Sequence, residues 1–203
     1  SDVSASLTYL NVLNNKLKTL PNKIGQLSTC LCRLDIANNK LESLSNSFGE
    51  LSRIQALDFE FNCLSIIPEN LDSMFGLQSL NLSNNLLQRL PRCLGRMRNL
   101  RSLSANQNAL EYIPHDLRSN STLEVLRLNS NKINTLPDNM GNLKTLRELW
   151  VNFNQLSYLP ITFCGLTNLQ ILRVEGNPAW RSPDMEVIDE GAQAVVGWCR
   201  RRW

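Results

Sequence analysis

The chain contains few of the side chains from which catalytic or metal sites are built. His115 is the only histidine among the 203 residues, so the usual groups for acid–base chemistry and histidine-rich metal sites are missing. Cys30 and Cys32 are closely spaced, but no second pair of this kind completes a metal site. The sequence also lacks a glycine-rich phosphate loop and the motifs of serine and zinc hydrolases. It therefore predicts a protein without catalytic residues, metal or cofactor.

A different kind of chemistry is indicated by three residues at equal spacing. Arg127, Trp150 and Arg173 follow one another at intervals of 23 residues. Tryptophan and arginine are enriched among the residues that dominate protein interfaces, so this spacing favours a protein-binding surface. The alternative is a tryptophan that is simply shielded by the aliphatic parts of its arginine neighbours. In either case, the spacing indicates that the three residues share one position in a repeated unit.

The repeated unit follows the pattern L-x-x-L-x-L-x-x-N-x-L. Its second leucine falls at Leu10, Leu34, Leu57, Leu80, Leu103, Leu126, Leu149 and Leu172. Its asparagine falls at Asn15, Asn39, Asn62, Asn85, Asn108, Asn131, Asn154 and Asn177. Eight matches in register over residues 7–178 identify a leucine-rich repeat solenoid.

The pattern predicts the structure of each unit. Two leucines alternating with polar residues form a short strand with one buried and one solvent-facing side. The asparagine can satisfy backbone groups where the chain leaves the strand, and Leu-Pro pairs such as Leu136-Pro137 begin the return half. The expected fold class is an α/β solenoid, a leucine-rich repeat horseshoe with a parallel concave sheet of about eight strands and short convex turns or helices. Eight units of 23–24 residues would occupy residues 1–178.

The C-terminal segment departs from the repeat. Residues 184–203 change to helical spacing, and Ser182-Pro183-Asp184 has the composition of a helix start. The expected apolar face consists of Met185, Ile188, Ala192, Val195, Cys199 and Trp203. Residues 179–203 are therefore predicted to form a C-terminal capping helix over the last unit.

The solvent-facing strand positions define the candidate binding surface. The central column reads Asn11, Asp35, Asp58, Asn81, Ser104, Arg127, Trp150 and Arg173, which predicts a change from acidic to basic along the sheet. The candidate protein-binding residues on this concave face are Asp35, Asp58, Glu60, Phe61, Arg127, Glu148, Trp150, Phe153 and Arg173.

Two features carry a family resemblance. The 23-residue unit with L-P-x-x-I-G-x-L, as at residues 20–27, resembles the Ras-group leucine-rich repeat proteins. The segment at residues 175–195, with the final Arg202-Trp203, is similar to the cap of plant intracellular Ras-group-related leucine-rich repeat proteins. The resemblance implies an intracellular signalling scaffold without enzymatic activity. Its implied partner is a protein such as a small GTPase or a signalling complex, bound through the concave face.

The cysteines bear on the cellular compartment. Secreted leucine-rich repeat proteins usually carry paired cysteines in both flanking caps, whereas the C-terminal cap here has only Cys199. Reduced thiols and a cytoplasmic location are therefore expected. The glycosylation sequons Asn81-Leu-Ser83 and Asn120-Ser-Thr122 keep an extracellular ligand-recognition domain open as an alternative.

Charge and hydropathy limit the remaining classes of function. The net charge of +3 gives no electrostatic case for nucleic-acid binding. No apolar stretch approaches the roughly 20 residues of a membrane span. We expect a monomer without a membrane span. Besides the extracellular domain, a second alternative to the signalling scaffold is the substrate-recognition part of a larger enzyme.

Overall fold

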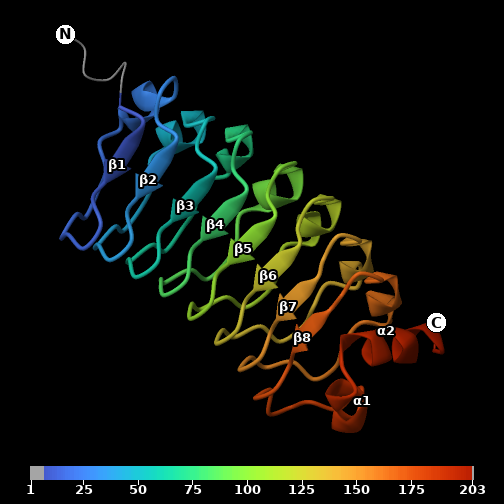
Figure 1. Ribbon diagram of the computed structural model, residues 1–203. Helices are drawn as coiled ribbons and strands as arrows, with labels where there is room; N and C mark the ends of the chain where they lie inside the picture. The colour runs from blue at the N-terminus through green and yellow to red at the C-terminus, as the bar shows by residue number, and fades with distance from the viewer. Residues whose placement is uncertain (1–6, 203) are drawn as a thin grey trace.

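The repeat units form the coils of one solenoid (Figure 1). The computed structural model describes residues 7–202. Its eight strands form one parallel sheet in chain order, and they are β1 Tyr9–Asn11, β2 Arg33–Asp35, β3 Ala56–Asp58, β4 Ser79–Asn81, β5 Ser102–Ser104, β6 Val125–Arg127, β7 Glu148–Trp150 and β8 Ile171–Arg173. The register places equivalent leucines side by side, such as Leu80 beside Leu103 and Leu126 beside Leu149. The predicted leucine-rich repeat fold is confirmed.

The return half of each of the first seven coils contains a short 3-10 helix. These helices are η2 Ile24–Leu27, η3 Asn46–Glu50, η4 Leu71–Ser73, η5 Arg92–Arg96, η6 His115–Ser119, η7 Met140–Asn142 and η8 Ile161–Gly165. Several contain a glycine at the same position, and the reason is close contact between coils. A β carbon on Gly95 would overlap the backbone of Asp116, and one on Gly141 would overlap the backbone of Thr162. The glycines therefore let adjacent return segments pack closely.

The asparagine column joins neighbouring coils from the inside. The Nδ2 group of Asn85 donates to the carbonyl oxygens of Phe59 and Leu82, at 2.9 and 3.1 Å. Its Oδ1 accepts the backbone N–H of Leu64 at 2.9 Å. The pattern recurs at Asn39, Asn62, Asn108, Asn131, Asn154 and Asn177. Each such side chain satisfies buried backbone groups of two coils, which confirms the role predicted for this column.

The C-terminal segment is helical, but the prediction of a single helix over residues 184–203 is wrong. Two helices, α1 Met185–Asp189 and α2 Ala192–Arg200, lie beside the last coil (Figure 1). The chain turns between them at Gly191, whose φ of 100° lies in a region open mainly to glycine. No helix within residues 7–202 has the length and apolar character needed to cross a membrane.

The packing of these two helices also corrects the expected helix start and apolar face. Asp184, and not Ser182, precedes the first helical turn, and no side-chain capping bond forms there. Ala192, Val195 and Cys199 are buried as expected. Met185 is 44% exposed, because α1 packs only Val187 and Ile188 against the core and both stay partly buried. The predicted contribution of residue 203 falls outside the described residues.

Candidate functional site

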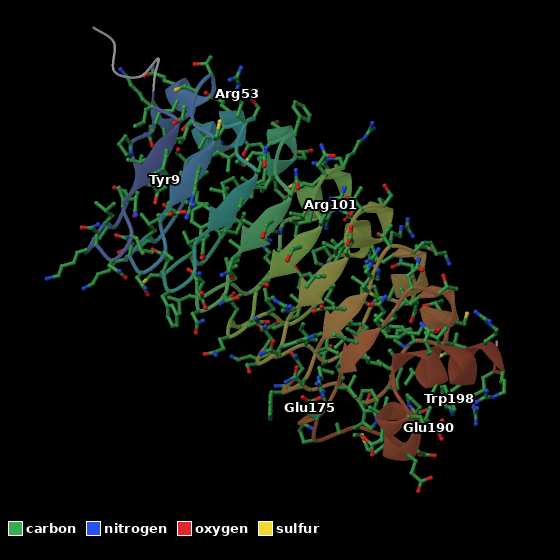
Figure 2. All side chains as sticks on the ribbon, in the orientation of Figure 1. Tyr9, Arg53, Arg101, Glu175, Glu190 and Trp198 are labelled. Atoms are coloured by element: carbon green, nitrogen blue, oxygen red, sulfur yellow. The ribbon has the colours of Figure 1, made fainter. Side chains whose placement is uncertain are left out.

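The predicted central column of the concave face is continuous. The sheet register places Asp35 beside Asp58 at one end, and Trp150 between Arg127 and Arg173 at the other. Figure 2 shows the two ends of this surface, with Tyr9 on β1 and Glu175 just after β8. The solenoid therefore gathers residues that are more than 130 positions apart in the sequence onto one face.

At the acidic end, Asp35 is largely neutralised by residues that the sequence analysis did not select. The Nη2 atom of Arg33 lies 2.9 Å from Oδ2 of Asp35, and the Tyr9 hydroxyl donates to the same oxygen at 2.8 Å. The Arg33 guanidinium also lies 5.0 Å from the centre of the Tyr9 ring. Hydrogen bonding from Arg33 holds the pKa of the Asp35 carboxyl below its usual range. The signal that could have identified Arg33 was its place two residues before Asp35, on the same side of the strand.

The negative charge that remains at this end belongs to Asp58 and Glu60. Asp58 accepts the backbone N–H of Glu60 at 2.9 Å. The Glu60 carboxylate accepts the side-chain amides of Asn81 and Asn84, at 3.3 and 3.1 Å. Neither carboxylate forms an ion pair with another described residue. Both are available to a cationic group of a partner.

At the basic end, part of the positive charge is also neutralised. Nη2 of Arg127 lies 2.9 Å from Oε2 of Glu148, and its guanidinium lies 4.8 Å from the centre of the Trp150 ring. Nε of Arg127 and Nε1 of Trp150 are buried without a hydrogen-bond partner among the described residues. Arg173 is exposed. The predicted change from acidic to basic along the sheet is therefore weaker than expected, because Arg33 and Glu148 partly neutralise the two ends.

Two phenylalanines occupy an unusual backbone position at the turn after the strand. Phe61 and Phe153 have φ values of 54° and 52°, in the left-handed region that bulky residues rarely adopt. The equivalent residues of the other units are Asn14, Asn38, Asn84, Gln107, Ser130 and Gly176. The phenylalanines are 52% and 58% exposed. Each combines backbone strain with exposed apolar surface, at a position where asparagine or glycine suits the fold better.

A shallow hollow of about 620 Å³ extends along the concave face from β2 to β6. Small side chains surround it, namely Ala56, Ser79, Asn81, Ser102 and Ser104. Arg33 and Asp35 border one end and Arg127 the other, and Asp58 also lines it. The sequence predicts small neutral residues here, and the structure shows that they leave room for side chains of a ligand.

The thiols and the histidine lie apart from this surface. Burial raises the pKa of the Cys93 and Cys199 thiols to about 11, so both stay protonated at neutral pH and are poor nucleophiles. His115 begins η6 in the return half of its coil. Within residues 7–202 no group of three or more histidine, cysteine, aspartate or glutamate side chains is placed to hold a metal ion.

The two glycosylation sequons have different surroundings. Asn120 is only 2% exposed, and its amide donates to the carbonyl oxygens of Leu94 and Met97, both at 3.0 Å. Asn81 is partly buried on the concave sheet. A glycan on Asn120 would require this part of the solenoid to open, so that sequon lends little support to an extracellular protein.

Comparisons with known proteins agree with this architecture. Two family profiles, both described as leucine rich repeat, match residues 118–178 and 76–97. No curated protein matches the chain.

Two solved structures are similar over most of the chain. A leucine-rich repeat protein of Leptospira interrogans is 33% identical with a TM-score of 0.80, over 87% of this chain and 44% of its own length. The ectodomain of the plant membrane receptor kinase GASSHO1/SCHENGEN3 from Arabidopsis thaliana, in complex with Casparian strip integrity factor 2, is 30% identical with a TM-score of 0.73. That likeness covers 81% of this chain and 20% of the ectodomain. The chain spans less than half the length of either protein.

Proposed function

We propose that this chain, which is a leucine-rich repeat protein, is a non-enzymatic scaffold that binds a protein partner through its concave face. Repeat domains of this kind are typically non-catalytic and bind proteins. The observation that carries the proposal is the pair Phe61 and Phe153, exposed and in the left-handed region. Strained residues that the fold does not need are characteristic of functional sites.

The concave hollow extends from β2 to β6, so Phe61, in the β3 coil, lies beside it, and Phe153, in the β7 coil, lies beyond its basic end. The two phenylalanines are 92 residues apart, which is four coils and roughly 19 Å at the usual strand spacing. Phe61 follows Asp58 and Glu60 on one coil, and Phe153 follows Trp150 on the other. A complementary partner would present apolar groups at both ends and polar groups over the small residues between them.

A capture experiment tests this proposal. The wild-type protein and a Phe61→Asn, Phe153→Asn variant are immobilised, exposed to a native cell extract and analysed by mass spectrometry. Asparagine stands at the same position in three other units, so we expect the variant to fold and to lose the partners of the wild type. Gln107→Asn, at the same turn position in another coil, is the matched control and should keep them. A folded double variant that retains every partner would remove the proposal.

A finer proposal concerns the cellular setting. We propose that the scaffold acts in cytoplasmic signalling, with a small GTPase or a signalling complex as partner, as in the Ras-group proteins that the sequence resembles. It is supported by the free thiols of Cys32, Cys63, Cys93, Cys164 and Cys199, and by the burial of Asn120. Thiol counting on protein denatured straight from its natural source should find these cysteines reduced. Disulfides among them would contradict a cytoplasmic location.

A second candidate function is extracellular ligand recognition. Its support is the likeness to a plant receptor ectodomain in complex with Casparian strip integrity factor 2. The same thiol count separates the two candidates, since an extracellular form should contain disulfides. A glycan on Asn81 of the natural protein would also favour this candidate.

A further inference from the structure

Two hollows, of about 280 and 320 Å³, lie away from the concave face, where the coils turn toward their return half. The first is bordered by Tyr112 and Tyr158, with Thr135 of the intervening coil between them. The second is bordered by Tyr112 and Arg89. Tyr112 and His115 line both hollows, so the two adjoin as one groove that crosses successive coils.

The spacing of the two tyrosines matches one particular backbone conformation. Tyr112 and Tyr158 hold the same position in units two coils apart, and their side chains are 48% and 47% exposed. At the usual strand spacing, two coils are separated by roughly 9.6 Å. A polyproline II helix has three residues per turn and a rise of about 3.1 Å, so it repeats about every 9.3 Å. Every third residue of such a helix can therefore lie against successive tyrosines.

The hydrogen-bonding groups of the groove also suit this conformation. The hydroxyls of Tyr112 and Tyr158 and the ring of His115 can donate, and no other described residue is bonded to them. Two of the three carboxylates that border the hollows already have partners. Glu69 accepts the backbone N–H groups of Arg92 and Cys93, at 3.2 and 3.1 Å, and Asp116 lies 3.9 Å from Arg92. Asp138 has no partner among the described residues and is left for a basic group of the ligand. A proline-rich chain presents carbonyl acceptors and few N–H donors, whereas an ordinary extended strand would bring N–H groups that need acceptors.

Two charges that lie two coils apart in the groove give a polarity to its ligand. Arg89 lies in the coil before Tyr112, where Glu69 also borders the hollow, and Asp138 lies in the coil between the two tyrosines. Neither Arg89 nor Asp138 forms an ion pair with another residue in 7–202. We propose that this groove binds a proline-rich segment of a partner protein in the polyproline II conformation, with a basic residue at Asp138 and an acidic residue at Arg89. Aromatic-lined grooves recognise such segments because the ligand is already ordered before it binds. This site is separate from the concave face and adds a second partner class to the scaffold.

Fluorescence anisotropy with defined peptides tests the proposal. The probe is fluorescein-labelled Pro-Pro-Arg-Pro-Pro-Glu-Pro-Pro, whose two charges are three residues or about 9.3 Å apart. Its reversed sequence is tested beside it, because a polyproline II helix can lie in either direction. We expect one of the two to bind saturably, and its analogue with alanine in place of every proline to bind about tenfold more weakly. The Tyr112→Ala protein should lose about tenfold in affinity, and Tyr158→Ala should lose less because it borders one hollow only.

The matched control is Ile66→Ala. Ile66 holds the same repeat position as the tyrosines and is 48% exposed, but it borders neither hollow. Its substitution should leave peptide affinity unchanged, and circular dichroism checks that every variant is folded. The proposal is overturned if neither peptide binds saturably, if the alanine analogue binds equally well, or if folded Tyr112→Ala binds like the wild type. A loss of affinity in Ile66→Ala equal to that in Tyr112→Ala would overturn it as well.

Discussion

Phe61 and Asn62 are adjacent in the chain, yet they belong to two columns of the solenoid with opposite roles. Asn62 is buried and bonded to backbone groups of its own and neighbouring coils. Its equivalents in the following units make the same bonds, and Asn108 and Asn131 do so while only partly buried. Phe61 is exposed, and its column also contains asparagine, glutamine, serine and glycine. The inner column is uniform because its bonds hold the coils together, whereas the outer column is free to vary and can serve binding.

The strongest test of this comparison is the substitution of two neighbouring asparagines. Asn85→Ala removes an amide that bonds two carbonyl oxygens and one N–H in the core, and should lower the free energy of unfolding by about 3 kcal/mol. Asn84→Gly, in the turn column with a φ of 56°, removes only one side-chain bond, to the partly buried Glu60, and should lower it by less than about 1 kcal/mol. Urea denaturation measures both. Equal losses would mean that the two columns do not differ in structural importance.

The next largest effect is expected at Gly176, which continues the turn column after Phe153. Its φ is 71°, and a β carbon there would overlap the Phe153 ring. Gly176→Ala should therefore lower the free energy of unfolding by about 2 kcal/mol. Gly197→Ala, in α2 with no neighbour closer than 3.6 Å, is the control and should not destabilise. Similar thermal midpoints for wild type and Gly176→Ala would show that this turn tolerates a side chain.

A gain in stability is expected where the turn column carries a phenylalanine. Phe61→Asn replaces a bulky residue in the left-handed region with one that adopts it readily, so the free energy of unfolding should rise by about 1 kcal/mol. Calorimetric unfolding of the two proteins measures the change. A decrease would assign Phe61 a structural role and weaken the case that it is present for binding.

The smallest effect concerns the acidic end of the concave face. The pKa of Asp35 is lowered in the folded protein by its bond to Arg33, so ionised Asp35 stabilises the fold above the ordinary aspartate pKa. This contribution is lost as the pH falls through the lowered pKa. Wild type should therefore be more stable than Asp35→Asn at pH 6, and the difference should shrink below about pH 4. A difference independent of pH would exclude the ion pair as its cause.

Side-chain pairing on the surface could not be predicted from repeat spacing. The central column was assigned correctly, but Arg33 and Glu148 lie in the neighbouring column and neutralise Asp35 and Arg127. Such pairs depend on which rotamers of long side chains meet across the sheet, and the repeat pattern carries no information about rotamers. The tyrosine groove was overlooked for a related reason, because Tyr112 and Tyr158 occupy a position where other units have unrelated residues.

The C-terminal helices illustrate the limit of local patterns. The apolar spacing from Met185 to Cys199 predicts one helix, yet Gly191 divides it and leaves Met185 exposed. The spacing identified the helical conformation correctly. It could not indicate that the last coil buries more of α2 than of α1. That difference depends on how the chain returns after β8.

The sequence by itself determined the solenoid, its eight strands, the buried leucine and asparagine columns and the residues of the concave face. These follow from periodicity, because every unit must bury the same positions against its neighbours. Only the tertiary structure decided which concave charges are neutralised, which turn residues are strained and where exposed tyrosines align into a groove. Those properties arise between coils, from contacts of side chains that lie 23 or more residues apart in the sequence.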